Sequence, residues 1–155
     1  MAEIADVAAY FCAKYPHKSE LSKTRLTKLV YLADWEFTKR EGRQMTPIRW
    51  YFHNFGPYVD DVIDSVSSDP RFSLREVQNA YGDSKLEIRL RDESNSSYTL
   101  TDNEVNVLDE VIARASPLYW NAFIKYVYET PPIASSDRYS YLDLTNFVRE
   151  AQNEF

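Results

Sequence analysis

Apolar residues recur every three or four positions along much of the chain, which is the spacing of one face of an α-helix. In the first such stretch Ile4, Val7, Ala8 and Phe11 form a single stripe, and Pro16 marks its end. The same periodicity, with its start and stop residues, predicts about six helices. Their expected ranges are residues 2–15, 22–42, 57–66, 116–128 and 142–154, with a further helix that begins at a capping box formed by Thr101 and Glu104. Pro131 and Pro132 are expected to close the helix of residues 116–128.

The second of these helices is apolar on almost every side. Eight of the twelve residues in 26–37 are apolar, which is typical of a helix surrounded by protein. Ser22 suits the N-cap of this helix, and Gly42 suits the position just after its end. Lys28 and Asp34 lie inside the apolar stretch. Either they are buried and need partners for their charges, or they reach solvent at the rim, and the sequence leaves both possibilities open.

One segment changes its period from helix to strand. Residues 86–91 alternate apolar and charged side chains, which predicts a half-buried strand. Residues 98–100 are expected to return as its partner, and residues 74–77 can add a third strand. The predicted fold class is therefore α+β, predominantly helical, with one small antiparallel β-hairpin or sheet. Residues 1–155 are expected to form a single domain.

Composition excludes several classes of protein. The chain has a formal net charge of −6, one cysteine and three glycines. Its glycines are too scattered for a phosphate-cradling loop, which excludes Rossmann and P-loop folds. Cys12 alone allows no internal disulfide, and no apolar run approaches the roughly 18 residues of a membrane helix. A cytoplasmic protein without a signal peptide and without membrane contact is therefore expected.

Catalytic and metal-binding motifs are missing from the sequence. His17 and His53 stand apart, and there is no CxxC, HExxH or GxSxG pattern. We therefore expect no enzyme, no cofactor and no metal site. One alternative is an enzyme that holds a metal ion with Asp60, Asp61 and Asp64, although acids at a helix start are more often solvated.

A second alternative is a DNA-binding transcriptional regulator. Helices followed by a hairpin have the outline of a winged helix, and the second predicted helix is basic. The net charge of −6 argues against this interpretation, because affinity for DNA rests mainly on the neutralisation of phosphates. The basic side chains concerned are Lys23, Arg25, Lys28, Lys39, Arg40 and Arg43.

Five segments, in this order, resemble the Panacea domain, the family of SocA-like antitoxins and mobile-element proteins. One departure is Phe55, because the family usually has histidine before the glycine of its turn. Here His53 lies three positions before that glycine. The resemblance spans about residues 4–150. The five segments are 25–35, Gly42-Arg43, 50–53, Gly56-Pro57-Tyr58 and 126–132.

The resemblance implies an antitoxin that neutralises a co-encoded protein toxin by direct contact. It also implies two further partners known in the family, a protease to which the toxin is delivered and operator DNA. Basic and acidic residues are concentrated in different parts of the chain, so self-association into a homo-oligomer is a further expectation. Within the domain, the resemblance assigns scaffold roles to Lys28, Tyr31, Asp34, Gly56 and Pro57.

Contacts with the toxin are expected among the aromatic residues. The chain has 12 tyrosines, eight phenylalanines and three tryptophans, and tyrosine and tryptophan are enriched at protein interfaces. The sequence does not decide which of them face outward. The candidates are Trp50, Phe52, Phe55, Tyr58, Tyr119, Trp120, Phe123 and Tyr126.

Overall fold

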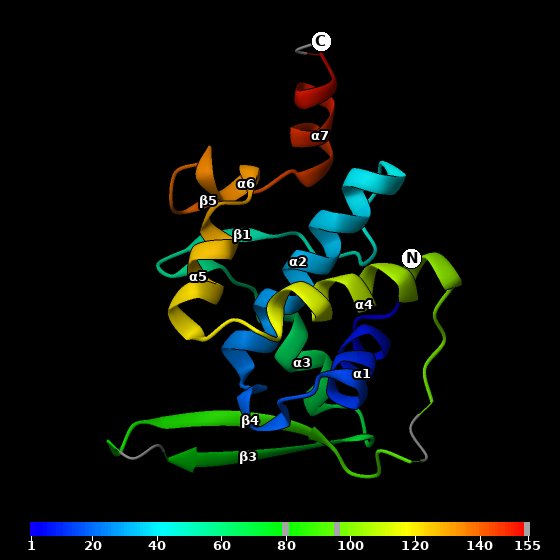
Figure 1. The fold of residues 1–155 in the computed structure, drawn as a ribbon, viewed down its shortest axis with the longest axis vertical. Coiled ribbons are helices and arrows are strands. Elements are labelled where there is room, and N and C mark those ends of the chain that lie inside the picture. Colours follow the sequence, from blue (N-terminus) through cyan, green and yellow to red (C-terminus); the bar gives the residue numbers. More distant parts are fainter. Residues whose placement is uncertain (79–80, 95–96, 154–155) are drawn as a thin grey trace.

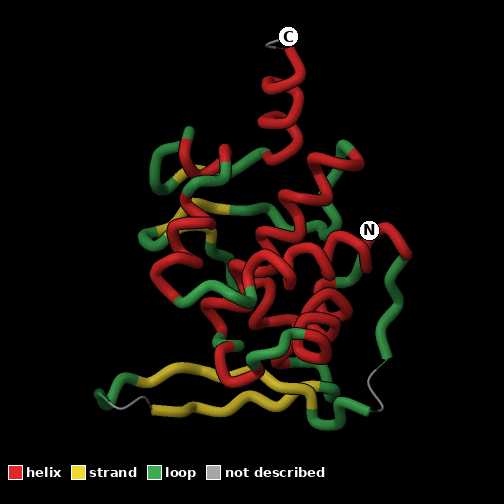
Figure 2. The backbone as a smooth tube through the Cα atoms, in the orientation of Figure 1, coloured by secondary structure: helices red, strands yellow, loops and turns green. Residues whose placement is uncertain are grey.

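The computed structural model of the chain describes residues 1–78, 81–94 and 97–153. It confirms an α+β, predominantly helical fold, as Figure 1 shows and as the colours of Figure 2 make plain. The helices in these ranges are α1 (Ile4–Lys14), α2 (Lys23–Glu41), α3 (Asp61–Ser67), α4 (Asp102–Ala115), α5 (Trp120–Tyr128), α6 (Pro131–Ala134) and α7 (Leu144–Asn153). The strands are β1 (Tyr51–His53), β2 (Gly56–Pro57), β3 (Phe72–Gln78), β4 (Ser84–Leu90) and β5 (Ser140–Tyr141).

The central element is α2, around which the other helices pack (Figure 1). Every residue from Arg25 to Thr38 is buried, and α2 contacts α1, α3, α4, α7 and β4. Both ends follow the predicted signals. Ser22 Oγ accepts a hydrogen bond from the Arg25 N–H at 3.2 Å, and Gly42 has a left-handed φ of 77°. The prediction of a helix enclosed by protein is confirmed.

Amphipathic helices supply much of the core around α2. On α1 three residues of the predicted stripe, Val7, Ala8 and Phe11, are fully inaccessible, and Ile4 is partly buried. Burial of each large side chain of this kind stabilises a fold by about 1.5–3 kcal/mol. At the start of α4, Thr101 and Glu104 form a capping box, with hydrogen bonds of 3.2 and 2.8 Å that satisfy two backbone N–H groups.

The helix start predicted at Pro57 is wrong. Pro57 lies in β2, opposite Phe52 of β1, and the N–H of Tyr58 donates to the carbonyl of Tyr51 at 2.9 Å. These pairings hold the chain extended, and α3 begins only at Asp61. Strand pairing therefore overrides the local preference of proline for the first turn of a helix.

The helix start predicted at Ser116 is also wrong. The Ser116 N–H donates to Ile112 at 2.9 Å, so this residue ends α4 instead of capping a new helix, and α5 begins at Trp120. Pro131, expected to close a helix, opens the short α6. The last helix agrees with the prediction, except that its predicted end at residue 154 lies outside the described residues.

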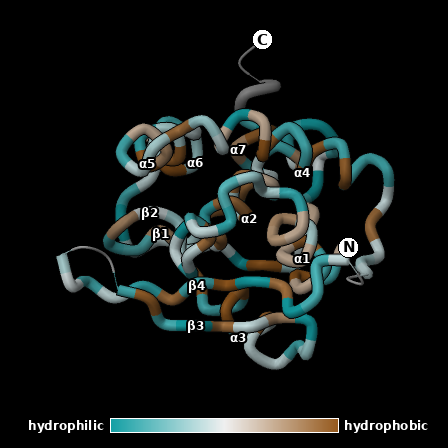
Figure 3. The backbone as a smooth tube through the Cα atoms, turned by 60° about the horizontal axis from the view of Figure 1, so that its bottom comes forward, coloured by the Kyte–Doolittle hydropathy of each residue, from teal (hydrophilic) through white to brown (hydrophobic). Residues whose placement is uncertain are grey.

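The strands β3 and β4 form an antiparallel ribbon along one side of the helices (Figure 1). The prediction of a strand at 86–91 is confirmed by β4, and brown and teal segments alternate along the ribbon in Figure 3. Its partner is β3, from the pair Phe72 and Leu90 to the pair Gln78 and Ser84. Residues 98–100 form no strand, because Tyr98 packs instead edge-to-face on Tyr10, with ring centroids 5.2 Å apart.

A second sheet, in the order β2-β1-β5, was not predicted as a sheet. Its strands have only two or three residues, which is too short for an alternating pattern. It joins residues near 50 to residues near 140, since β1 pairs with both β2 and β5. Just before β5, Tyr139 has a positive φ of 67°, and its N–H donates to Phe52 at 2.6 Å.

Candidate functional site

Asp34 is fully buried and ties α2 to the segment that follows it. Its carboxylate accepts hydrogen bonds from the Thr46 N–H at 2.8 Å, the Thr46 hydroxyl at 2.6 Å and the Trp50 indole at 2.8 Å. Gln44 approaches the same carboxylate at 3.4 Å. Burial raises the pKa of Asp34 to about 7, and the hydrogen bonds from Thr46 and Trp50 oppose that rise. Of the two possibilities left open by the sequence, Asp34 takes the buried and partnered one.

Lys28 is also buried, but its charge lacks a partner. Its side chain is 1% exposed. Among the described residues, no carboxylate forms an ion pair with its ammonium and no acceptor takes a hydrogen bond from it. Removal from water alone lowers the pKa of Lys28 to about 8. The expectation that buried charges have partners therefore holds for Asp34, whereas Lys28 has no protein partner for its ammonium among the described residues.

Two further motif residues, Tyr31 on α2 and Pro57 on β2, are also buried. The hydroxyl of Tyr31 shares a hydrogen bond of 2.8 Å with Thr130, which joins α2 to the start of α6. Its ring packs edge-to-face on Trp50, with centroids 5.4 Å apart. Burial raises the pKa of the Tyr31 hydroxyl. These contacts agree with a scaffold role, which stays a prediction.

Gly56 lies at the start of β2 with a φ of 104°, a region that residues with a Cβ rarely adopt. A Cβ there would meet Tyr128 Cε2 at 3.5 Å and Lys28 Cε at 3.7 Å, which are ordinary contact distances. Backbone conformation, rather than space, is therefore what requires glycine.

Gly56→Ala is expected to lower the free energy of unfolding by about 1–2 kcal/mol, because of this backbone strain. Urea denaturation measures the change. Gly82→Ala is the matched control, since Gly82 has a φ of 82° with nothing within 4 Å of its Cβ position. We expect similar losses at the two sites. An unchanged stability of Gly56→Ala would contradict the requirement for glycine.

The structure divides the eight aromatic candidates into three groups. Trp50, Phe52 and Phe123 are 0, 4 and 0% exposed, so these three belong to the core and offer no surface to a partner. Their burial follows from strand pairing and from the apolar face of α5. Tyr58 and Tyr126 are half-buried. The exposed ones are Phe55, Tyr119 and Trp120, at 78, 86 and 44%.

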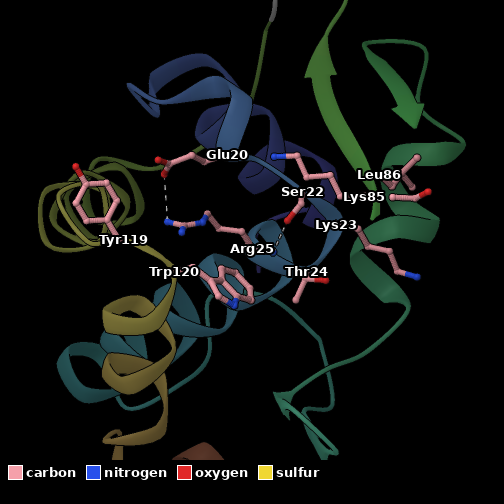
Figure 4. Close-up of a pocket in the computed structure, with 10 residues that line it drawn as sticks. Glu20, Ser22, Lys23, Thr24, Arg25, Lys85, Leu86, Tyr119 and Trp120 are labelled. Atoms are coloured by element: carbon pink, nitrogen blue, oxygen red, sulfur yellow. Dashed lines mark hydrogen bonds and ion pairs between the residues drawn. The ribbon is translucent and has the colours of Figure 1, made fainter. Parts of the chain in front are cut away.

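Two of the exposed aromatics, Tyr119 and Trp120, border a groove of about 740 Å³ (Figure 4). We call it the α2 groove, because it lies across the start of α2. Its other walls come from β4 and the start of α5. The lining residues are Glu20, Ser22, Lys23, Thr24, Arg25, Ser84, Lys85, Leu86, Tyr119 and Trp120.

Arg25 is the most deeply buried charged group that lines the α2 groove. It is 3% exposed, and its guanidinium carbon lies 5.4 Å from the ring centroid of Trp120 and 4.5 Å from that of Phe123. Its Nη1 donates to the Tyr15 hydroxyl at 3.1 Å and lies 3.4 Å from Glu20 Oε2 (Figure 4). Aromatic stacking and one ion pair thus hold a positive charge beside the exposed Trp120.

A model of the family described as antitoxin SocA-like, Panacea domain, matches residues 26–132, more than half of the chain. The chain belongs to this family. Neither a curated protein nor a solved structure matches it. The matched part of the Panacea domain contains the five residues predicted to have scaffold roles, as well as Tyr119 and Trp120. The resemblance inferred from the motifs is confirmed.

Several groove residues of this Panacea-domain protein could not be found from its sequence. Glu20 lies in a short turn, Lys85 lies on β4, and neither belongs to a motif. Outside the groove, Tyr139 and Tyr141, 61 and 56% exposed, were missed as exposed aromatics, because a two-residue strand and the residue before it are too short to show a period. Arg25 was noted for its charge, but a helix pattern does not reveal that aromatic rings stack on it.

The described part of the Panacea domain lacks the features of a metal site, a reactive cysteine or a membrane-spanning helix. There, no three His, Cys, Asp or Glu side chains gather to hold a metal ion, and Asp60, Asp61 and Asp64 are exposed around the start of α3. Burial raises the pKa of the Cys12 thiol to about 12, which disfavours the reactive thiolate. Across the same residues, no helix is both long enough and apolar enough to span a membrane.

The basic second helix does not form the DNA-reading surface of a winged helix. Arg25 and Lys28 are buried inside the Panacea domain. Lys39 forms an ion pair with Glu36 at 2.8 Å, and Arg40 pairs with Glu110. A recognition helix must expose one face to enter the major groove, whereas α2 is enclosed from Arg25 to Thr38.

Proposed function

We propose that this Panacea-domain protein is an antitoxin that neutralises a co-encoded protein toxin by direct contact, without catalysis. The observation that carries the proposal is the match of the antitoxin family over residues 26–132. Further support comes from the α2 groove, which combines exposed aromatic rings with fixed charges but holds no arrangement typical of catalysis.

The α2 groove is the proposed contact surface. Tyr119 and Trp120 are adjacent, and both are large side chains of the kind that dominate binding energy at interfaces. Trp120 rests on Arg25 and on Phe123, whose ring centroid is 6.0 Å away, so its position is already ordered before a partner arrives. A pre-ordered anchor costs less entropy when the complex forms.

The proposal extends to location and domain organisation. We place the protein in the cytoplasm, which agrees with a single buried cysteine. We also propose that residues 1–155 act as one domain. Delivery of the toxin to a protease, contact with operator DNA and homo-oligomer formation stay predictions and are not needed for neutralisation.

A growth assay tests the proposal. The neighbouring open reading frame is expressed alone and together with this chain. We expect toxicity in the first case and normal growth in the second, with the two proteins co-purifying. A neighbouring product that is harmless, or toxicity that this chain does not relieve, would overturn the antitoxin role.

Trp120→Ala tests the α2 groove as the contact surface. We expect it to weaken toxin binding by about 2 kcal/mol, or about thirtyfold, as for a central interface aromatic, and to reduce growth rescue. Tyr81→Ala is the matched control, since Tyr81 is 90% exposed and lies outside the groove lining. Equal rescue by both variants, each with an intact thermal transition, would contradict this location of the interface.

A further inference from the structure

The α2 groove is basic in a chain that is acidic as a whole. Lys23, Arg25 and Lys85 line it against the single acid Glu20, while the formal net charge of the protein is −6. The groove also meets the first turn of α2, where the helix dipole adds partial positive charge. Arg25, Lys85 and a helix start therefore meet at one concave surface, which favours a negatively charged ligand. Lys23 stands at its rim, because its ammonium lies over the Tyr58 ring, 5.5 Å from the ring centroid. The Lys85 ammonium donates to the Ser19 carbonyl at 2.6 Å.

The Arg25 guanidinium has N–H donors that form no hydrogen bond with the described residues. Its side chain is 3% exposed, yet within the described residues its only hydrogen bond runs from Nη1 to Tyr15. Nε and Nη2 donate none there. The Glu20 oxygen 3.4 Å from Nη1 has no hydrogen-bond partner among the described residues, so this ion pair is poorly aligned. A guanidinium forms its strongest contacts with a carboxylate that accepts two parallel hydrogen bonds.

An apolar surface lies directly beside this charge. Tyr119 and Trp120 are 86 and 44% exposed, and Leu86 is half-buried in the opposite wall. Figure 4 shows the Arg25 side chain between the two aromatic residues, pointing toward Glu20. The Arg25 guanidinium and the Trp120 ring are therefore close enough for two neighbouring side chains of one ligand to contact both.

We infer that the α2 groove binds a segment of the toxin in which an aspartate or glutamate lies next to a large apolar side chain. The ligand carboxylate forms an ion pair with Arg25. The positive charges of Lys23 and Lys85 attract this carboxylate to the groove. The apolar side chain of the ligand packs on Trp120. That the segment belongs to the toxin rests on the proposed function. A protein segment is favoured over nucleic acid, because Glu20 in the groove and the net charge of −6 repel a continuous run of phosphates.

Charge reversal in the toxin complex tests the inference. Lys85→Glu and Lys23→Glu alter exposed and half-exposed side chains, so the fold should be retained. We expect each to weaken toxin binding about tenfold or more in calorimetry, with slower association. Lys14→Glu, at an exposed lysine outside the groove lining, is the matched control and should bind like the unchanged protein. Tight toxin binding by both groove variants would overturn the inference and leave the antitoxin role intact.

A peptide probe tests the same site without a toxin. The probes are acetyl-Gly-Glu-Phe-Glu-Leu-Gly-amide, its glutamine counterpart and a short oligothymidylate, each added to the full chain while the Trp120 indole N–H signal is followed by NMR. We expect a saturable shift with the acidic peptide only, and its loss in Lys85→Glu. No shift at millimolar peptide, or an equal shift with the glutamine peptide, would overturn the inference, and stronger binding of oligothymidylate would assign the groove to nucleic acid. If the growth assay fails but the acidic peptide binds, the proposed function falls and the groove chemistry stands.

Discussion

Replacement of Asp34 by asparagine is expected to lower the free energy of unfolding by about 2–4 kcal/mol. The carboxylate lies among donors only: the N–H and hydroxyl of Thr46 and the indole N–H of Trp50, all within 2.8 Å. An asparagine amide has one oxygen and one NH₂ group. Whichever way it turns, NH₂ meets another donor, and at least one buried N–H or O–H loses its acceptor.

Urea denaturation measures this loss in the free energy of unfolding, provided that the variant and the unchanged protein have the same m-value. Asp137→Asn is the control, because Asp137 is exposed and its carboxylate accepts no hydrogen bond within the described residues. We expect it to change stability by less than about 0.5 kcal/mol. If Asp34→Asn were no worse than this control, the hydrogen bonds that Asp34 accepts would contribute little to stability.

Lys28→Met is expected to stabilise the protein at neutral pH by up to about 3 kcal/mol. Lys28 is 1% exposed and has no ion-pair partner among the described residues, so the folded state bears the cost of a desolvated charge. The size follows from the fall of its pKa from 10.5 to about 8, at roughly 1.4 kcal/mol for each pKa unit. Methionine fills a similar volume without the charge.

The pH dependence of this gain has a definite sign. The pKa of Lys28 is lower in the folded than in the unfolded chain, so between about pH 8 and 10.5 the unfolded state binds more protons. The unchanged protein therefore gains stability as pH rises through this window, whereas Lys28→Met does not. The advantage of the variant should be constant below about pH 8 and should vanish near pH 10.5.

Denaturation at several pH values measures the difference, with Lys14→Met as a control at an exposed lysine. A Lys28→Met protein that is less stable than the unchanged one at neutral pH would mean that the ammonium makes a stabilising contact. A protein that is more stable but no longer neutralises the toxin would show that the buried charge is kept for binding.

Local signals in the sequence predicted those features that depend on a few neighbouring residues. Ser22, Gly42 and the pair Thr101 and Glu104 marked helix ends correctly, because caps act through hydrogen bonds to their own helix. Pro57 misled, since its conformation is decided by pairing with Phe52 across a turn. Strand partners were mistaken for the same reason: a short segment such as residues 98–100 does not reveal which distant element will cover it.

The candidate site was harder to predict than the fold. Aromatic composition indicated a contact surface, but Trp50 and Phe123 look no different in sequence from the exposed Trp120. Their burial depends on how the chain just before β1 and one face of α5 pack on α2, where Trp50 contacts Tyr31 and Phe123 contacts Arg25. The basic character of the groove also arises in space, because Lys85 joins Lys23 and Arg25 only when β4 lies beside the start of α2.

The position of the α2 groove also has a consequence for the lifetime of the protein against proteolysis. Its floor is the cap and first turn of the helix on which the rest of the core is packed, from Ser22 to Arg25. A partner held there binds the folded chain and not the unfolded one, so it reduces the unfolded population in proportion to its concentration over its dissociation constant. Proteases that cleave only opened chains would then remove the free protein faster than the complex. The lifetime of the molecule would thereby report whether its partner is present.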